Sequence, residues 1–305
     1  MFDHGSGRRW AMCTVVMLAA LLAGTEPART QAGNGGCRDG GTRSAVLIQG
    51  FDYPREAGPA GDSFVFQYEI SAWRRLLERA LGFPAEAVLW LPLDKTERAS
   101  SSRSAPAREA LGAAQRFLTA GAKGPCDLAL LLYAGHGRRH GVAWRYKTPE
   151  AVTGWMRWSG LPGNAEEDGD FLALLRGIQG AGRAIAVVQS CFSGALIAPA
   201  TQAWNGESRL SLYTATDADE RCRYLGSYET ADGERMVHVG GLYFQQMRGY
   251  LARQAAAGRL DLNRDGKLDA GEIETAFDAA HEAAAAYLDG LPEYGQAPRK
   301  KLLRR

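Results

Sequence analysis

The stretch RAIAVVQSCFSGALI, residues 183–197, decides how the fold is interpreted. Its first part, up to Val188, is apolar and partly β-branched, which is typical of a strand buried on both faces. The apolar run stops at Gln189, and Cys191 follows among small polar residues and a glycine. A buried cysteine before a turn is one interpretation of this pattern. The other is a nucleophilic thiol presented at the carboxyl end of a central strand.

Strands of the same kind recur along the chain and alternate with helical patterns. Buried strands are predicted at 44–51, 87–93, 127–137, 184–188 and 210–218. Apolar residues at helical spacing predict helices between them at 63–82, 108–122 and 170–182. This alternation indicates βαβ units. We therefore predict an α/β fold whose mostly parallel sheet carries helices on both faces.

The N-terminus has the order of a secretory signal peptide. Arg8 and Arg9 precede an uncharged apolar run, residues 11–24, and small and polar residues follow up to Ala32. The run is too short to span a bilayer comfortably, although an uncleaved anchor is the alternative. We predict that residues 1–32 are removed and that the protein is exported, to the periplasm or outside the cell. No other segment is apolar enough to span a membrane.

Composition and charge narrow the classes of function. A chain of 305 residues that is 46% hydrophobic is long enough for one large domain or two small ones. Its net charge of +2 gives no overall field that favours nucleic acid or an acidic partner. The only basic cluster is RKKLLRR, residues 299–305, which we predict to be an unstructured, solvated tail.

Two polar motifs stand at the carboxyl ends of predicted strands, so both should lie at the same rim of the sheet. AGHG places His136 at the end of one strand, and QSCFSG places Cys191 at the end of another. Parallel sheets bind ligands beyond these strand ends. An imidazole near a thiol lowers its pKa and handles the leaving-group proton. The N–H groups of Gly137 and Cys191 could form an oxyanion hole. A serine hydrolase is disfavoured, because G-x-S-x-G is absent.

The same motifs carry a resemblance to a known group of enzymes. YAGHG at 133–137 and QSCFSG at 189–194 resemble the histidine and cysteine motifs of the caspase, metacaspase and legumain group of cysteine peptidases. LYTATDADERCRY at 212–224 resembles the next strand of bacterial legumain-like members, which borders the substrate cleft. The resemblance implies that Cys191 attacks a peptide carbonyl and that His136 protonates the leaving amine. It requires no third catalytic residue.

The resemblance also suggests residues of a substrate pocket. Arg55 follows the first strand, in a region where caspases and legumain use an arginine for specificity. Gln189 stands where metacaspases carry an acid that selects basic residues and where caspases carry glutamine. Asp217, with Asp219 and Glu220, could instead attract a cationic side chain. Cleavage after Asn, Asp or Arg/Lys therefore stays open.

A second motif, DLNRDGKLDAGE at 261–272, matches an EF-hand calcium loop. Gly266 stands where the loop turns sharply, and predicted helices at 242–258 and 271–288 flank it. The predicted calcium ligands are Asp261, Asn263, Asp265, the backbone carbonyl of Lys267, Asp269 and Glu272. A lone loop of this kind either docks on the α/β domain or pairs between molecules. In an exported protein we expect calcium to act as a structural staple more than as a sensor.

Together these observations predict an exported cysteine endopeptidase that acts on a peptide or protein substrate and binds calcium. The alternative is a non-catalytic calcium-binding or peptide-binding protein on the same fold. His140, His238 and His281 are expected at the surface or in packing. If Cys191 stays free, at most one disulfide can form among Cys37, Cys126 and Cys222. The predicted organisation is a signal peptide at 1–32, a flexible lead-in at 33–43, a peptidase domain at 44–255, an EF-hand region at 256–290 and a basic tail at 291–305.

Overall fold

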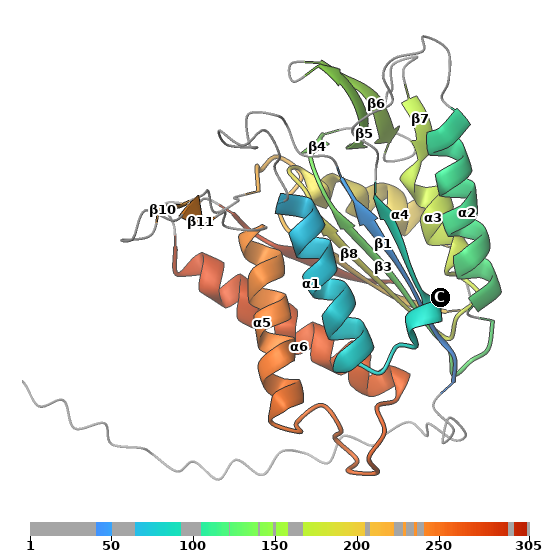
Figure 1. The fold of residues 1–305 in the computed structure, drawn as a ribbon, viewed down its shortest axis with the longest axis vertical. Helices are drawn as coiled ribbons and strands as arrows, with labels where there is room; N and C mark the ends of the chain where they lie inside the picture. The colour runs from blue at the N-terminus through green and yellow to red at the C-terminus, as the bar shows by residue number, and fades with distance from the viewer. Residues whose placement is uncertain are drawn as a thin grey trace, which may run out of the picture. The chain divides into compact units, whose positions relative to one another are not determined.

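A six-stranded sheet runs through the computed structural model, with the strand order β12-β9-β8-β3-β1-β2 (Figure 1). Its strands are β1 (Arg43–Gln49), β2 (Val88–Pro92), β3 (Leu128–Ala134), β8 (Arg183–Gln189), β9 (Arg209–Thr214) and β12 (Arg299–Leu303). The structure describes residues 41–50, 65–92, 105–121, 123–139, 141–148, 151–157, 167–204, 208–222, 228–229, 235–236, 241–291 and 296–303. The predicted signal peptide lies outside these residues, which all belong to one unit spanning 36–305.

The first five of these strands are parallel, as predicted. Every residue of β3 is buried, and so is every residue of β8 after Arg183. Continuous burial explains why these strands read as unbroken apolar runs, since both faces of the sheet are covered. In the register of these two strands, Ala134 faces Gln189, so the two strands end level with each other.

Helices cover both faces of the sheet. The helices α1 (Val65–Arg79), α5 (Leu242–Ala256) and α6 (Ala270–Asp289) pack on the face that carries Ala45 and Leu47. The opposite face carries Val46 and Ile48 and packs against α2 (Ala105–Gly121), α3 (Phe171–Gly177) and α4 (Ile197–Ala203). Neighbouring residues of β1 thus belong to different cores, as the period of two along a strand requires. Of the helices in the described part of the chain, none combines the length and apolarity needed to cross a bilayer.

The basic C-terminal segment differs from its prediction. Residues 299–303 form β12, which pairs antiparallel with β9 at the edge of the sheet, so the prediction of an unstructured tail is wrong there. Lys300 lies beside Asp278 at 2.6 Å and over the ring of Tyr213, and Leu303 is buried. Charged side chains suit an edge strand, because they keep it from pairing with other chains. Backbone pairing with β9 is therefore what orders this segment.

The segment after His136 forms a second sheet. Its strands are β4 (Gly137–Arg138), β5 (Gly141–Thr148), β6 (Ala151–Arg157) and β7 (Glu167–Asp170), in that order. β4 starts just after β3 ends, so this sheet grows from the carboxyl edge of the central one (Figure 1). The short turns η2 (Ala85–Ala87) and η3 (Ser193–Leu196) and a small ladder of β10 (Tyr228–Glu229) with β11 (Arg235–Met236) complete the described elements.

Candidate functional site

The ends of β3 and β8 bring His136 and Cys191 to the same rim of the sheet, as the sequence predicts. Each lies two positions beyond the last register pair, Ala134 with Gln189. The N–H of Gly135 donates to the carbonyl of Gln189 at 3.1 Å, so the pairing of the two strands continues into the polar motifs. Two strands that end level therefore set the positions of both candidate catalytic residues.

Glycines beside His136 allow the backbone to approach its neighbours. A Cβ at Gly137 would lie 2.3 Å from the carbonyl oxygen of Cys191, and a Cβ at Gly135 would lie 2.4 Å from the hydroxyl of Tyr133. That hydroxyl donates to the carbonyl of His136 at 3.0 Å. The imidazole packs edge-on against Phe66 of α1, with the ring centroids 5.3 Å apart. The hydroxyl of Tyr133 thus holds the backbone of His136, and Phe66 of α1 holds its ring.

The turn after Cys191 is strained and held by hydroxyl groups. Phe192 lies in the left-handed region with φ of 58°, which is rare for a residue with a side chain and is often found at functional sites. Thr216, two residues after β9, accepts a hydrogen bond from the N–H of Ser193 at 3.0 Å and donates to the carbonyl of Ser190 at 3.3 Å. The N–H of Thr216 donates in return to the Ser193 hydroxyl at 3.2 Å. A buried threonine therefore clamps both sides of the cysteine.

Cys191 is half-buried, and its pKa is lowered from the ordinary value to about 6. The largest cause is a hydrogen bond with the thiol of Cys222, whose sulfur lies 3.4 Å from that of Cys191. Burial opposes this shift, while the backbone of Cys222 and the positive charges of His136 and Arg221 add to it. A thiolate is the nucleophilic form of cysteine, so the thiol is activated near neutral pH.

Cys222 is a residue of the site that the sequence suggested only as a possible disulfide partner. Its side chain is buried and is not part of a disulfide, whereas Cys126 is disulfide-bonded. Its N-terminal neighbours hold it near Cys191, since the carbonyl of Glu220 accepts the N–H of Phe192 at 2.7 Å. The only signal in the sequence was the resemblance of 212–224 to a strand that borders a cleft.

The three predicted pocket residues have different positions. Gln189 is fully buried, and its amide oxygen accepts the N–H of Phe244 at 3.1 Å, at the start of α5. A Cβ at Gly241 would overlap this amide group, which shows how closely β8 and α5 meet. Gln189 therefore caps a helix here, and its place in a substrate pocket stays a prediction. Arg55 lies outside the described residues.

Asp217 does lie close to the cysteine turn, and its charge is paired. A Cβ at Gly194 would lie 2.8 Å from the Asp217 Cα. The pKa of Asp217 is lowered by the backbone N–H of Ala218 and then by the guanidinium of Arg299. Arg299 donates to it through Nη2 at 2.6 Å and through Nε at 3.0 Å. The aspartate thus anchors β12 beside the candidate site.

The segment just before β12 also supports the loop at 215–220. The sequence did not predict this support. The side-chain amide of Gln296 donates to the carbonyl of Ala215 at 2.8 Å. The carboxylate of Glu220 accepts the N–H groups of Ala297 at 2.8 Å and of Asp217 at 3.1 Å. Residues 215–220 therefore hold the cysteine turn on one side and the C-terminus on the other.

The 261–272 loop joins α5 to α6 and turns its oxygen-bearing side chains inward. The carboxylate of Asp261 accepts the N–H groups of Asp265 at 3.1 Å and of Gly266 at 2.8 Å. Asn263 Oδ1 also accepts the N–H of Asp265, at 2.9 Å. Gly266 has φ of 81° and nothing near a would-be Cβ, so its backbone conformation is what requires glycine. The turn of the loop is therefore built as the motif predicts.

The last predicted ligands form the start of α6. Asp269 and Glu272 make a reciprocal capping box, in which the Glu272 N–H donates to Asp269 at 2.7 Å and the Asp269 N–H donates to Glu272 at 2.9 Å. Glu272 also accepts the N–H groups of Leu262 at 2.7 Å and Asn263 at 3.0 Å. The Glu272 carboxylate thus joins the last residue of the loop to its second and third residues.

The donor set fits calcium, which takes carboxylate, amide and carbonyl oxygens. Within the described part of the chain, however, no three His, Cys, Asp or Glu side chains already converge as a metal cluster. The carboxylates of the loop instead accept its own backbone N–H groups, so a bound cation would compete with these hydrogen bonds.

The loop docks on the α/β domain. The guanidinium of Arg43, in β1, donates to the carbonyls of Leu268 and, at 2.6 Å, Leu81. Burial lowers the pKa of Arg43. Leu268 packs on the core that Leu260 and Ile273 enter. Of the two sequence-based alternatives for a lone loop, the structure therefore has docking within the chain.

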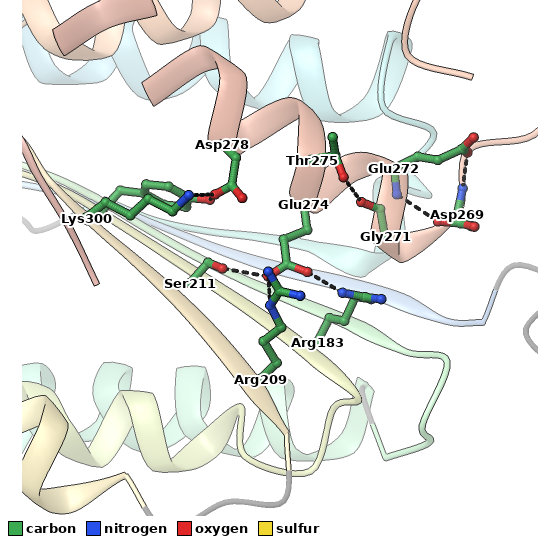
Figure 2. A network of polar contacts seen from close by, with 11 residues as sticks. Arg183, Arg209, Ser211, Asp269, Gly271, Glu272, Glu274, Thr275, Asp278 and Lys300 are labelled. Atoms are coloured by element: carbon green, nitrogen blue, oxygen red, sulfur yellow. Dashed lines mark hydrogen bonds and ion pairs between the residues drawn. The ribbon is translucent and has the colours of Figure 1, made fainter. Parts of the chain in front are cut away.

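A second anchor ties α6 to the sheet (Figure 2). Glu274 is buried, accepts the hydroxyl of Ser211 at 2.6 Å, and pairs with Arg209 at 2.7 Å and with Arg183. One carboxylate thus joins the start of β8 and the start of β9 to the helix that follows the loop. A buried charge is tolerated when it is paired and hydrogen-bonded in this way.

Of the remaining histidines, only His281 is described. Its Nδ1 lies 2.8 Å from the hydroxyl of Tyr243, which joins α5 to α6. Burial lowers the pKa of His281 to about 4, so the ring is neutral at physiological pH. The prediction of a packing histidine is confirmed here, while His140 and His238 lie outside the described residues.

No protein-family model matches the chain, and no curated protein matches its sequence significantly.

Proposed function

We propose that this protein is an exported cysteine endopeptidase that cleaves peptide bonds through Cys191 and His136. One observation carries the proposal. The Cys191 thiol has a pKa of about 6 and lies just after β8, level with His136, which lies just after the neighbouring strand β3. Perturbed pKa values at such strand ends are typical of catalytic groups.

In the proposed reaction, the Cys191 thiolate attacks the carbonyl carbon of the scissile peptide bond. The N–H groups of Gly137 and Cys191 stabilise the oxyanion that forms. His136 gives a proton to the leaving amine as the C–N bond breaks, which leaves a thioester on Cys191. Water then attacks the thioester while the imidazole takes a proton, and the thiolate returns.

The neighbouring acids bear on the specificity of the proposed peptidase. Asp217 is neutralised by Arg299, and Asp219 forms an exposed ion pair with Arg139 at 3.1 Å. Both partners compete with any cationic substrate side chain, which weighs against cleavage after Arg or Lys. Arg55 is the proposed determinant for an acidic or amide side chain, and the preferred residue is an outcome of the test below.

Calcium is the proposed cofactor of the 261–272 loop. Its proposed ligands are Asp261, Asn263, Asp265, the Lys267 carbonyl, Asp269 and Glu272. A bound calcium would supply positive charge that holds these oxygens together at the start of α6. Because α6 is anchored to β8 and β9 through Glu274, the ion would act as a staple between the helix pair and the sheet.

The test gives the exported, purified protein a mixed fluorogenic peptide library, with calcium and then with chelator. Cys191→Ala and His136→Ala variants run alongside, with circular dichroism to check their folding. We expect cleavage by the parent alone, and the cleaved peptides identify the preferred residue. Equal cleavage by Cys191→Ala, or no cleavage by a folded and calcium-loaded parent, would contradict the proposal.

A further inference from the structure

We propose that Cys222 forms a reversible disulfide with Cys191, which makes the pair a thiol–disulfide switch within the candidate site. The effect on catalysis rests on the proposed function, whereas the disulfide itself does not. Neither cysteine is part of a disulfide, and the two come from segments 31 positions apart in the sequence.

The geometry brings the two sulfur atoms almost into bonding range. They lie 3.4 Å apart, and a disulfide bond of about 2.05 Å would bring them closer by about 1.4 Å. The backbones that carry them are joined by the hydrogen bond from Phe192 to Glu220, at 2.7 Å. Thr216 adds the clamp on Ser190 and Ser193. Side-chain rotation can therefore close the gap while the two segments stay in place.

Exposure makes the roles of the two thiols unequal. Cys191 is half-buried and reachable, whereas the exposed fraction of Cys222 is 7%. An oxidant in solution therefore reacts with Cys191 first, and the buried thiol of Cys222 lies next to it. This is the arrangement of a reactive thiol with a resolving thiol. Cys126 is already in a disulfide, so it does not compete for either sulfur.

The co-reactant is a low-molecular-weight disulfide such as oxidised glutathione. The Cys191 thiolate attacks one of its sulfur atoms, forms a mixed disulfide and releases one thiolate. Cys222 then loses its proton to solvent and attacks the Cys191 sulfur, which expels the second thiolate. Two protein thiols are oxidised, and one small disulfide is reduced to two thiols. The product has no nucleophilic thiolate at position 191 and returns to the dithiol form with a reductant.

The experiment equilibrates the full protein in mixtures of reduced and oxidised glutathione, then quenches with acid and alkylates the remaining thiols. Mass spectrometry of the digest measures the peptide pair cross-linked through Cys191 and Cys222, and peptide cleavage is measured in the same samples. We expect the cross-link to rise as activity falls, with one common midpoint, and dithiothreitol to reverse both. A parent protein that gains only the glutathione mixed disulfide at Cys191 would overturn the switch.

Two variants sharpen the result. In Cys222→Ser, we expect the glutathione adduct to persist at Cys191, because no resolving thiol displaces it. In Cys191→Ala, we expect Cys222 to stay unmodified, because it is buried. Rapid glutathione adduct formation on Cys222 in that variant would contradict its assignment as the inaccessible partner.

The readouts separate this proposal from the proposed function. If the cross-link forms but the protein shows no peptidase activity, the result supports the disulfide and contradicts the proposed peptidase. If the protein is an active peptidase and oxidation abolishes its activity while no cross-link forms, the result supports the peptidase and contradicts the switch.

Discussion

At its carboxyl end, β8 leads into a half-buried thiol and a left-handed Phe192, which hydroxyl groups hold in place. At its amino end, the same strand begins with Arg183, paired with the buried carboxylate of Glu274. The carboxyl end of β8 keeps the Cys191 thiol accessible in a strained turn. At the amino end, the charges of Arg183 and Glu274 pair with each other, and the carboxylate is buried. The carboxyl end of β8 is thus a reactive edge, and its amino end is a stabilising edge. Changes at the first should alter chemistry more than stability, and changes at the second should do the reverse.

The largest loss of stability is expected for Glu274→Gln. It leaves Arg183 and Arg209 without their carboxylate, while their side chains are only 24% and 30% exposed. Loss of one partner of a buried pair costs about 3–5 kcal/mol, and we expect about 3 because both guanidiniums keep some solvent contact. Urea unfolding measures this change.

The matched control for Glu274→Gln is Asp219→Asn, which breaks an ion pair whose side chains are 64% and 78% exposed. Screening by solvent limits such a pair to less than about 1 kcal/mol. Equal losses of stability in the two variants would remove the distinction between enclosed and exposed charges.

Calcium removal should have the next largest effect. A ligand that binds only the folded state stabilises it by about 2.7 kcal/mol at a concentration 100 times its Kd. We expect the unfolding midpoint to fall when calcium is chelated, and Glu272→Gln to lose most of this response. Lys267→Ala is the control, because only its backbone carbonyl is proposed to bind. Identical unfolding with calcium and with chelator would contradict the staple.

At the reactive edge, Thr216→Val should reduce peptide cleavage more than it reduces stability. The change leaves the buried N–H of Ser193 without its acceptor, at a cost of about 1–3 kcal/mol. The cysteine turn then relaxes, and the attack geometry is lost. Thr275→Val, on the exposed side of α6, is the control and should change neither property. A loss of stability in Thr216→Val with full cleavage activity would count against the clamp.

The smallest effect at neutral pH is expected for His281→Gln. The pKa of His281 is about 4 in the folded protein and about 6.5 in an unfolded chain, so the unfolded chain takes up the proton first as pH falls. The stability of the parent should therefore fall between about pH 6.5 and pH 4, and the variant should lack this part of the pH dependence. Urea unfolding at several pH values checks this, and parallel curves for both proteins would contradict it.

The 261–272 loop and its flanking helices could largely be predicted from the sequence, because their signals are local. The letters of 261–272 predict the loop turn at Gly266, and the apolar period predicts α5 and α6. The anchors of the loop were not readable, since Arg43 lies far away in the sequence and forms its contacts only in the folded chain. The inward position of Glu272 is likewise a matter of hydrogen bonds that no spacing specifies.

At the reactive edge, the strand pattern predicted that His136 and Cys191 would share a rim, because parallel strands end at one edge. It did not predict that Cys222 would meet Cys191, since that contact depends on how the loop after β9 folds back. β12 was missed for a related reason. Its charged residues carry little strand signal, and pairing with β9 supplies the order that local propensity lacks.

The most direct measurement is the alkylation rate of Cys191 as a function of pH, read from the mass of its peptide, beside the rate of peptide cleavage. Thiolate is the reacting form, so we predict that both rates rise through about pH 6 and level off above it. Cys222→Ala should move the rise to higher pH, because the hydrogen bond that is the main cause of the lowered pKa is lost. An alkylation rate that keeps rising to about pH 8.5, the range of an ordinary thiol, would contradict the activated nucleophile on which the proposed function rests.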